Sequence, residues 1–303
     1  LGEALRAQGR LRDAGECLER ARRARPHDPA ALLALARLRQ AEDRPQLAEA
    51  ALREAAAQRP ASTAAAQELG DFLRRRGRIL EGIGWQRRSL GCADEILPTR
   101  EPGRRRVAFV VQHASTWSSL ASVYAAFRAD PSWETTLVAL PYNHPYLPNP
   151  ADRTAIFSFL AKEGLPFVRG EDFALEPGCA DVLFLQNPYD VTRPAGWTAP
   201  ELLRVVPRLA YVPYAIEIGG TSEDTTHQFN QPVHNLGWAV FARSEAHRTL
   251  FAQHGRVGNA HVTVTGHPKF DLICGLAHAE PDPELAAFAR VRPVVLWDPR
   301  CDI

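Results

Sequence analysis

The chain has 303 residues, of which 45% are hydrophobic and 23% charged, an ordinary composition for a globular protein of more than one domain. Its net charge of +1 gives no sign of a polyanionic partner, so nucleic acid is not expected to bind, and no apolar run reaches the roughly 18 residues of a membrane span. The charge is uneven, because residues 1–106 carry 22 Arg and 15 acidic residues while residues 107–303 carry 14 basic and 20 acidic residues. The basic first third is compatible with a peripheral contact at an anionic membrane face, and equally with solvated helix surfaces.

The cysteines favour a reducing compartment. The chain has five, none spaced as CxxC and none beside a patterned His, which argues against a metal site and against a disulfide framework. The first 25 residues are charged throughout and do not resemble a signal peptide, so we expect a cytoplasmic location. Because the chain starts at Leu1 and contains no Met, we expect a piece of a longer protein.

A repeat covers residues 1–95. Leu and small residues recur at a 34-residue spacing: Leu1-Gly2 returns as Leu35-Ala36 and as Leu69-Gly70. Pro26 and Pro60 follow the second helix of each unit, where proline ends a helix. This pattern resembles the tetratricopeptide repeat and predicts helical hairpins, a fold that binds protein partners. The alternative is that the repeats only pack on the neighbouring domain.

After a polar linker at 96–106, the pattern changes to strands alternating with helices. Strands are expected at Val107–Val111, Thr135–Leu140, Phe167–Val168, Asp181–Leu185, Leu209–Val212, Gly237–Phe241 and His261–Val264. Helices are expected at Ser118–Arg128, Asp152–Glu163, Pro200–Val206 and Ser244–His254. The alternation predicts a Rossmann-like parallel sheet over 107–280, so the fold class is α plus α/β. No Gly-x-Gly-x-x-Gly follows the first strand, so no dinucleotide cofactor is expected.

A second apolar run, Pro293–Pro299, stands close to the end of the chain. We interpret it as the first strand of a further Rossmann-like domain that begins at 290–303.

Ligands of open parallel sheets bind beyond the carboxyl ends of the strands, and here those ends are rich in His, Tyr, Asn and Ser. A His or Glu there could deprotonate an acceptor hydroxyl, and the candidates are His113, Glu217 and His227. Each could instead be a structural loop residue. Candidates for substrate binding are Ser115, Asn143, Tyr214, Ser244, His267 and Lys269. Ser244 could equally be a helix N-cap, and Lys269 a solvated residue after a turn.

Three segments carry a resemblance to a known family. They are Phe109–Leu120 with Tyr124 and Asp130-Pro131, the strand Tyr211-Val-Pro-Tyr214, and Thr265-Gly-His-Pro-Lys-Phe-Asp271 leading to Val295–Pro299. Over 107–303 the chain resembles the CDP-glycerol:polyglycerophosphate glycerophosphotransferases, which are two-domain GT-B enzymes of surface-polymer synthesis. The resemblance implies the acceptor-type half of a GT-B fold, a nucleotide-activated donor (CDP-glycerol or a nucleotide sugar) held mainly by the second domain, and a polymer acceptor. Teichoic-acid members have a His-Gly pair where this chain has Tyr214-Ala215, so that family His is absent.

Three hypotheses follow for the function. The first is a metal-independent glycosyl- or glycerophosphotransferase of cell-surface polymer synthesis. The second is a non-catalytic scaffold, in which the repeats recruit a partner and a degenerate α/β domain supports them. The third is a nucleotide-sugar epimerase.

Overall fold

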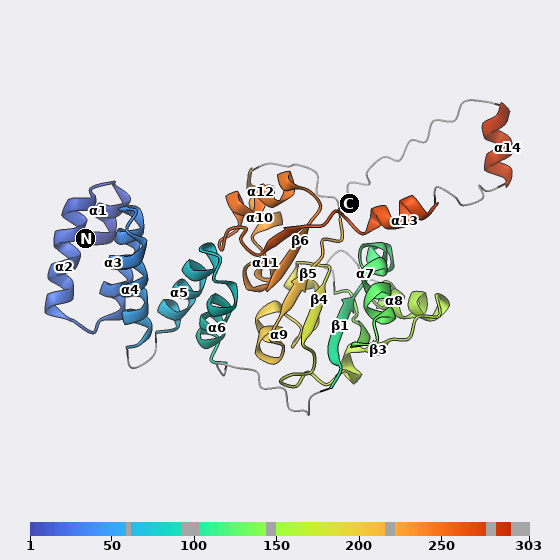
Figure 1. Cartoon of the computed structure of the whole chain (residues 1–303), viewed down its shortest axis with the longest axis horizontal. Helices are drawn as coiled ribbons and strands as arrows, with labels where there is room; N and C mark the ends of the chain where they lie inside the picture. The colour runs from blue at the N-terminus through green and yellow to red at the C-terminus, as the bar shows by residue number, and fades with distance from the viewer. Residues whose placement is uncertain (59–61, 93–102, 144–149, 216–221, 277–282, 292–303) are drawn as a thin grey trace.

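The computed structural model describes residues 1–58, 62–92, 103–143, 150–215, 222–276 and 283–291. Figure 1 shows a row of helical hairpins beside a single twisted sheet flanked by helices. The predicted fold class, helical hairpins followed by a parallel α/β domain, is therefore present. The expected strand at 293–299, and with it the start of a further domain, lies outside the described residues.

Three hairpins form the helical part of the described chain. They pair α1 (Gly2–Ala7) with α2 (Leu11–Ala24), α3 (Pro29–Ala41) with α4 (Pro45–Ala56), and α5 (Thr63–Arg75) with α6 (Ile79–Ser89). The second helices begin at residues 11, 45 and 79, which reproduces the 34-residue period of the sequence. The turn within each hairpin contains a residue with positive φ: Gly9 (77°), Asp43 (53°) and Gly77 (79°). Glycine adopts this conformation without steric cost, and Asp is among the few other residues that tolerate it.

All seven strands of the described sheet are parallel, in the order β3-β2-β1-β4-β5-β6-β7. Their bounds are β1 Arg105–Val111, β2 Trp133–Ala139, β3 Val168–Arg169, β4 Val182–Leu185, β5 Leu209–Tyr211, β6 Ala239–Ala242 and β7 Val262–Val264. The chain order reverses between β1 and β4, and this is the switch point at which doubly wound sheets bind ligands. Strand β1 is buried on both faces, as its continuous apolar run predicts.

Helices cover the two faces of the sheet unevenly. On one face α7 (Ala121–Ala129) and α8 (Pro150–Lys162) pack on β1 and β2 through Tyr124 and Ile156. On the other face α9 (Ala199–Val205), α11 (Pro232–Leu236) and α12 (Glu245–His254) contribute Leu202, Val233 and Phe251. The remaining helices are α10 (Ser222–Phe229), α13 (Lys269–Leu276), α14 (Pro283–Val291) and the short 3-10 turns η1 (Ala114–Ser119), η2 (Gly170–Asp172) and η3 (Asp190–Thr192).

The third hairpin is joined to the sheet domain by buried polar side chains. The fully buried Arg74 donates from Nη2 to the carbonyl of Gly237 (2.5 Å) and from Nη1 to Gln86 (3.2 Å). Gln86 donates in turn to Asp71 (2.8 Å) and to the carbonyl of Asn235 (3.1 Å). Burial raises the pKa of Asp71, and the Arg256 guanidinium 3.0 Å away opposes that rise. These bonds fix the repeats to the segment that leads into β6.

One detail differs from the sequence prediction. The polar segment around His227 and His234, for which the sequence pattern predicts no helix, contains α10 and α11. The reason is local: Pro232 stands at the first turn of α11, Gln231 and His234 cap it reciprocally, and Val233 is buried. Lys269, considered as a solvated residue after a turn, is partly exposed, directly follows the turn at Pro268 and begins α13. The N-cap interpretation of Ser244 holds, because its Oγ accepts a hydrogen bond from the amide of His247 (3.2 Å).

Candidate functional site

A polar pocket lies at the switch point, beyond the carboxyl ends of β1 and β4. Its volume is about 160 Å³, and it is lined by Gln112, His113, Ser115, Thr116, Tyr142, Gln186, Asn187 and Tyr214. Gln112 directly follows β1 and Gln186 directly follows β4. The register pairs Val110 with Leu185, so both glutamines lie at the same edge of the sheet. The position agrees with the rule that ligands of doubly wound sheets bind where the strand order reverses.

Hydrogen bonds hold the polar floor of the pocket in place. Gln186 donates from Nε2 to Thr116 Oγ1 (2.7 Å) and accepts from Ser119 Oγ (3.2 Å). Gln112 donates to the carbonyl of Thr192 (2.7 Å), and Asn187 donates to the hydroxyl of the same residue (3.0 Å). Buried amides with satisfied bonds are rigid, so the groups that face the pocket are pre-oriented.

His113 is the N-cap of η1, and its bonds define its protonation. The amide of Ser115 donates to His113 Nδ1 (3.3 Å), and Ser115 Oγ lies 2.8 Å from the same nitrogen. A ring nitrogen that accepts an amide proton carries none of its own, so the neutral ring has its proton on Nε2. The Ser115 hydroxyl therefore directs its proton to Nδ1. In this arrangement His113 can accept a proton only through Nδ1, the nitrogen next to the Ser115 hydroxyl.

Two tyrosines complete the pocket. The ring of Tyr142 meets that of His113 edge-on, with centroids 5.6 Å apart. Burial, with a smaller contribution from the neighbouring Tyr214, raises the pKa of Tyr142, so its hydroxyl remains protonated at neutral pH. No cluster of three or more His, Cys, Asp or Glu side chains suited to a metal occurs in the described part of the chain.

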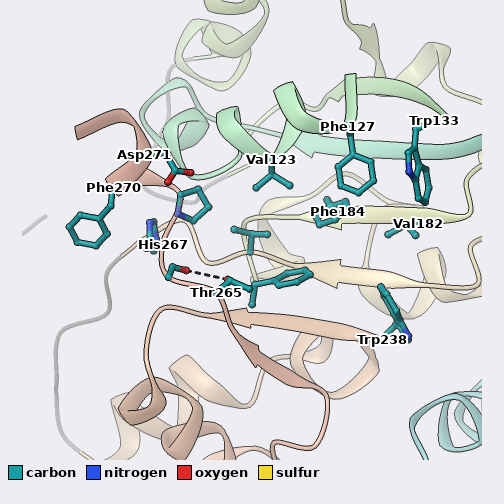
Figure 2. Close-up of a pocket in the computed structure, with 14 residues that line it drawn as sticks. Val123, Phe127, Trp133, Val182, Phe184, Trp238, Thr265, His267, Phe270 and Asp271 are labelled. Carbon is teal, nitrogen blue, oxygen red and sulfur yellow. Dashed lines mark hydrogen bonds between the residues drawn. The ribbon is translucent and has the colours of Figure 1, made fainter. Parts of the chain in front are cut away.

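The structure brings together only some of the residues predicted for the site. His113, Ser115 and Tyr214 line the polar pocket, whereas Asn143, Ser244, His227 and Lys269 are not among its lining residues. His227 stacks on Tyr189, with centroids 5.4 Å apart, and the amide of Asn143 donates to Thr192. His267 lines a separate apolar groove on the sheet face, shown in Figure 2. Glu217 lies outside the described residues.

Sequence reasoning did not select Gln112, Thr116, Tyr142, Gln186 or Asn187 as site residues. A signal was present for the two glutamines, since each directly follows a predicted buried strand. Thr116 gave no such signal, because its place depends on the η1 turn that follows His113.

The buried histidines of this domain are neutral. Burial lowers the pKa of His234 and His261 to about 3 and that of His247 to about 4. Burial also lowers the pKa of His267, with the Lys269 charge adding to the effect. No helix in the described ranges is both long and apolar enough to cross a membrane.

Comparison with known proteins gives little further guidance. No protein-family model matches the chain, and no curated protein matches its sequence. Among solved structures, a mutant O-GlcNAc transferase from Thermobaculum terrenum aligns with 88% of this chain at 12% identity and a TM-score of 0.27. The alignment covers 55% of that transferase chain, so the present chain spans about half its length. A similarity of this size does not establish a shared activity.

Proposed function

We propose that the sheet domain binds the acceptor of a group-transfer reaction, with the acceptor hydroxyl in the polar pocket at the switch point. The observation that carries this proposal is the His113–Ser115 pair in a pocket of neutral hydrogen-bonding side chains. Amides and hydroxyls of this kind suit a sugar or glycerol unit, and a volume of about 160 Å³ suits a fragment of that size.

The pair offers a route for the acceptor proton. As the acceptor oxygen attacks the donor, its proton passes to Ser115 Oγ while the Ser115 proton passes to His113 Nδ1, which leaves an imidazolium. The bond to the nucleotide phosphate breaks, and the nucleotide carries away the electron pair. Tyr142, held protonated, can donate a hydrogen bond to the acceptor.

The transferred group would be glycosyl or glycerophosphoryl, with CDP-glycerol or a nucleotide sugar as the donor and a surface polymer as the acceptor. These finer assignments rest on the sequence resemblance of Thr265–Asp271 and its neighbours. A cytoplasmic location rests on the cysteine spacing and on the charged first 25 residues, and a peripheral membrane contact rests on the basic first third. A protein partner for the repeats rests on the 34-residue pattern.

A non-catalytic scaffold is the second candidate. The observation that favours it is the Tyr214-Ala215 sequence, which stands where the resembling enzymes have a His-Gly pair. A scaffold would keep the repeats but would not depend on the chemistry of His113.

Release of CMP from CDP-glycerol, or of UDP from a UDP-sugar, by the longest natural form of the protein tests the proposal. We expect His113→Ala to lower the rate on the order of 10²–10⁴-fold. Ser115→Ala should also lower the rate, because it removes the hydroxyl that passes the acceptor proton to His113. His27→Ala, which changes an exposed histidine of the repeats, is the matched control. Equal rates for His113→Ala and His27→Ala would favour the scaffold.

A further inference from the structure

The polar pocket at the switch point has no permanent charge among the described residues that line it. None of these residues is Lys, Arg, Asp or Glu, and those that can titrate are His113, Tyr142 and Tyr214. The segments 144–149 and 216–221, which follow the two tyrosines closely in the chain, contain no Lys or Arg in their sequences. An anionic group in the pocket would therefore have no lysine or arginine from these parts of the chain to neutralise it.

The donors of Arg193 are engaged within the fold. This arginine does not line the pocket, but its Nη1 donates to the carbonyl of the pocket residue Asn187 (2.7 Å). Its Nε donates to the carbonyl of Trp197 (2.8 Å), and its Nη2 forms an ion pair with the Asp190 carboxylate. The side chain is fully buried, and Asp190 opposes the lowering of the Arg193 pKa that burial causes. Arg193 thus positions Asn187, and its charge is balanced by Asp190.

Two side chains of the pocket spend their hydrogen-bond donors on the main chain. The Nε2 group of Gln112 donates to the carbonyls of Pro141 (3.2 Å) and Thr192 (2.7 Å), and the Thr116 hydroxyl donates to the carbonyl of His113 (2.8 Å). Because a Gln side chain has two N–H donors and a Thr hydroxyl has one, neither has a donor left for a ligand. The side-chain oxygen of Gln112 has one long bond among the described residues, from the Thr192 hydroxyl (3.4 Å), so it can accept from a ligand.

The other two amides of the pocket keep one donor each. Gln186 and Asn187 donate one N–H to a threonine hydroxyl, at 2.7 Å and 3.0 Å, which leaves a second N–H on each amide. The pocket therefore offers acceptors as well as donors. A hydroxyl group of a ligand matches this mixture because it donates and accepts at once. An ionised carboxylate or phosphate only accepts, so it cannot donate to the side-chain oxygen of Gln112.

The surroundings of the pocket also disfavour negative charge. Burial raises the pKa of Tyr142, which means that an anion at this position is less stable than in water. An anionic ligand would lose its hydration in the same place and would gain no paired cation from the lining residues. Burial of an unpaired charge is costly, whereas burial of a hydroxyl that forms hydrogen bonds is not.

We propose that the pocket selects an uncharged polyhydroxylated unit, such as a neutral hexose, and excludes a unit that carries a phosphate or a carboxylate. This inference rests on the proposed function and deepens it, because it names the class of acceptor that the same pocket holds. The acceptor polymer then presents a neutral sugar at its end, and any phosphate of the polymer stays outside the pocket.

Titration of the 303-residue chain with matched neutral and anionic ligands, followed by ligand-observed NMR, tests the proposal. The pairs are the methyl β-glycosides of glucose and galactose with the corresponding uronides, and glycerol with glycerol 1-phosphate. We expect saturable binding of the neutral hexosides and a dissociation constant at least about 10-fold larger for the uronides, which corresponds to about 1.4 kcal/mol. Glycerol 1-phosphate should likewise bind more weakly than glycerol. The titrations are run at about pH 8, where an ordinary imidazole is neutral.

A charge added to the pocket tests whether its neutrality causes the selection. Ser115→Lys places a cation at an exposed position of the lining and should reduce the preference for the neutral hexosides at least about 10-fold. Ser158→Lys, which changes an exposed serine of α8 outside the lining, is the matched control and should keep the wild-type preference. Thermal melting establishes that each variant is folded, and the ligand pairs with the unaltered chain decide the matter if Ser115→Lys is not.

Three results would overturn the proposal: equal or tighter binding of the anionic ligands, no saturable binding of either neutral hexoside, or an unchanged preference in folded Ser115→Lys. Failure of the proposed function is a separate result. Selective binding of neutral ligands by a protein that transfers no group would support the selection and contradict the transferase. An active enzyme that uses anionic acceptors equally well would support the transferase and contradict the selection.

Discussion

Three buried histidines predict a steep loss of stability in mild acid. His234, His247 and His261 have pKa values lowered by burial to about 3, 4 and 3, so their rings stay neutral in the folded protein between pH 7.5 and 5.5. In the unfolded chain each ring titrates near 6.5. The unfolded state therefore binds more protons as the pH falls, and the free energy of unfolding falls with it.

The magnitude follows from the same pKa values. Between pH 7.5 and 5.5, a ring that titrates at 6.5 when unfolded and far lower when folded removes about 1.4 kcal/mol of stability. Three such rings remove about 4 kcal/mol together, and His267 acts in the same direction. Denaturant unfolding followed by circular dichroism at the two pH values measures the difference.

A substitution assigns the effect to individual rings. His261 donates from Nε2 to the carbonyl of His234 (2.8 Å), and glutamine can keep that donor without titrating. His261→Gln should therefore reduce the pH-dependent loss by about one third, whereas His27→Gln at an exposed position should leave it unchanged. A total loss below about 1 kcal/mol, or no difference between the two variants, would refute the reasoning.

Three further predictions concern the hairpins and can be checked by thermal melting with circular dichroism. Gly82→Ala should destabilise the protein by about 1–3 kcal/mol, because the added Cβ would lie 2.6 Å from the carbonyl oxygen of Gly70 at the α5–α6 crossing. The control is Gly84→Ala, where nothing lies near the new methyl group. Equal melting temperatures for the two variants would contradict this prediction. Asp43→Gly should stabilise the protein by up to about 1 kcal/mol, because glycine adopts the positive φ of 53° at this turn without steric strain. A lower melting temperature for this variant would argue against strain at this turn. Gln86→Ala should lower the free energy of unfolding by about 1–3 kcal/mol, because it leaves buried hydrogen-bond partners unpaired between the third hairpin and the sheet domain. If the stability falls no further than in Gln8→Ala, which changes an exposed glutamine, these buried bonds are not needed for stability.

The sequence alone was sufficient to predict the features that depend on a local pattern of residues. The 34-residue period predicts where the second helix of each hairpin begins, and the apolar run Val107–Val111 identifies a strand buried on both faces. Ser244 was recognisable as a cap because the helix start lies within the same few residues. These features depend on residues close together in the chain, which is why sequence alone revealed them.

Features that depend on contacts between residues far apart in the chain could not be predicted from the sequence. Gln186 became part of the pocket because β4 pairs with β1, which places it beside Thr116, 70 positions earlier. Arg74 resembled any solvated arginine of a basic helix, and only its bond to Gly237, 163 positions later, makes it a buried junction residue. Helix α11 was missed because five residues are too few to show helical periodicity.

The junction between the third hairpin and the sheet has a consequence for how the array ends. Stacked repeats need a terminal unit with a polar outer face, because the last hairpin otherwise exposes its apolar side. Here Ile83 belongs to the core of the sheet domain, and Arg87 donates to the carbonyl of Leu203 (3.0 Å). The sheet domain is thus the terminal cap of the helical array. Any repeat grafted in place of the third hairpin must reproduce this mixed surface, whereas repeats inserted before it need only match their neighbours.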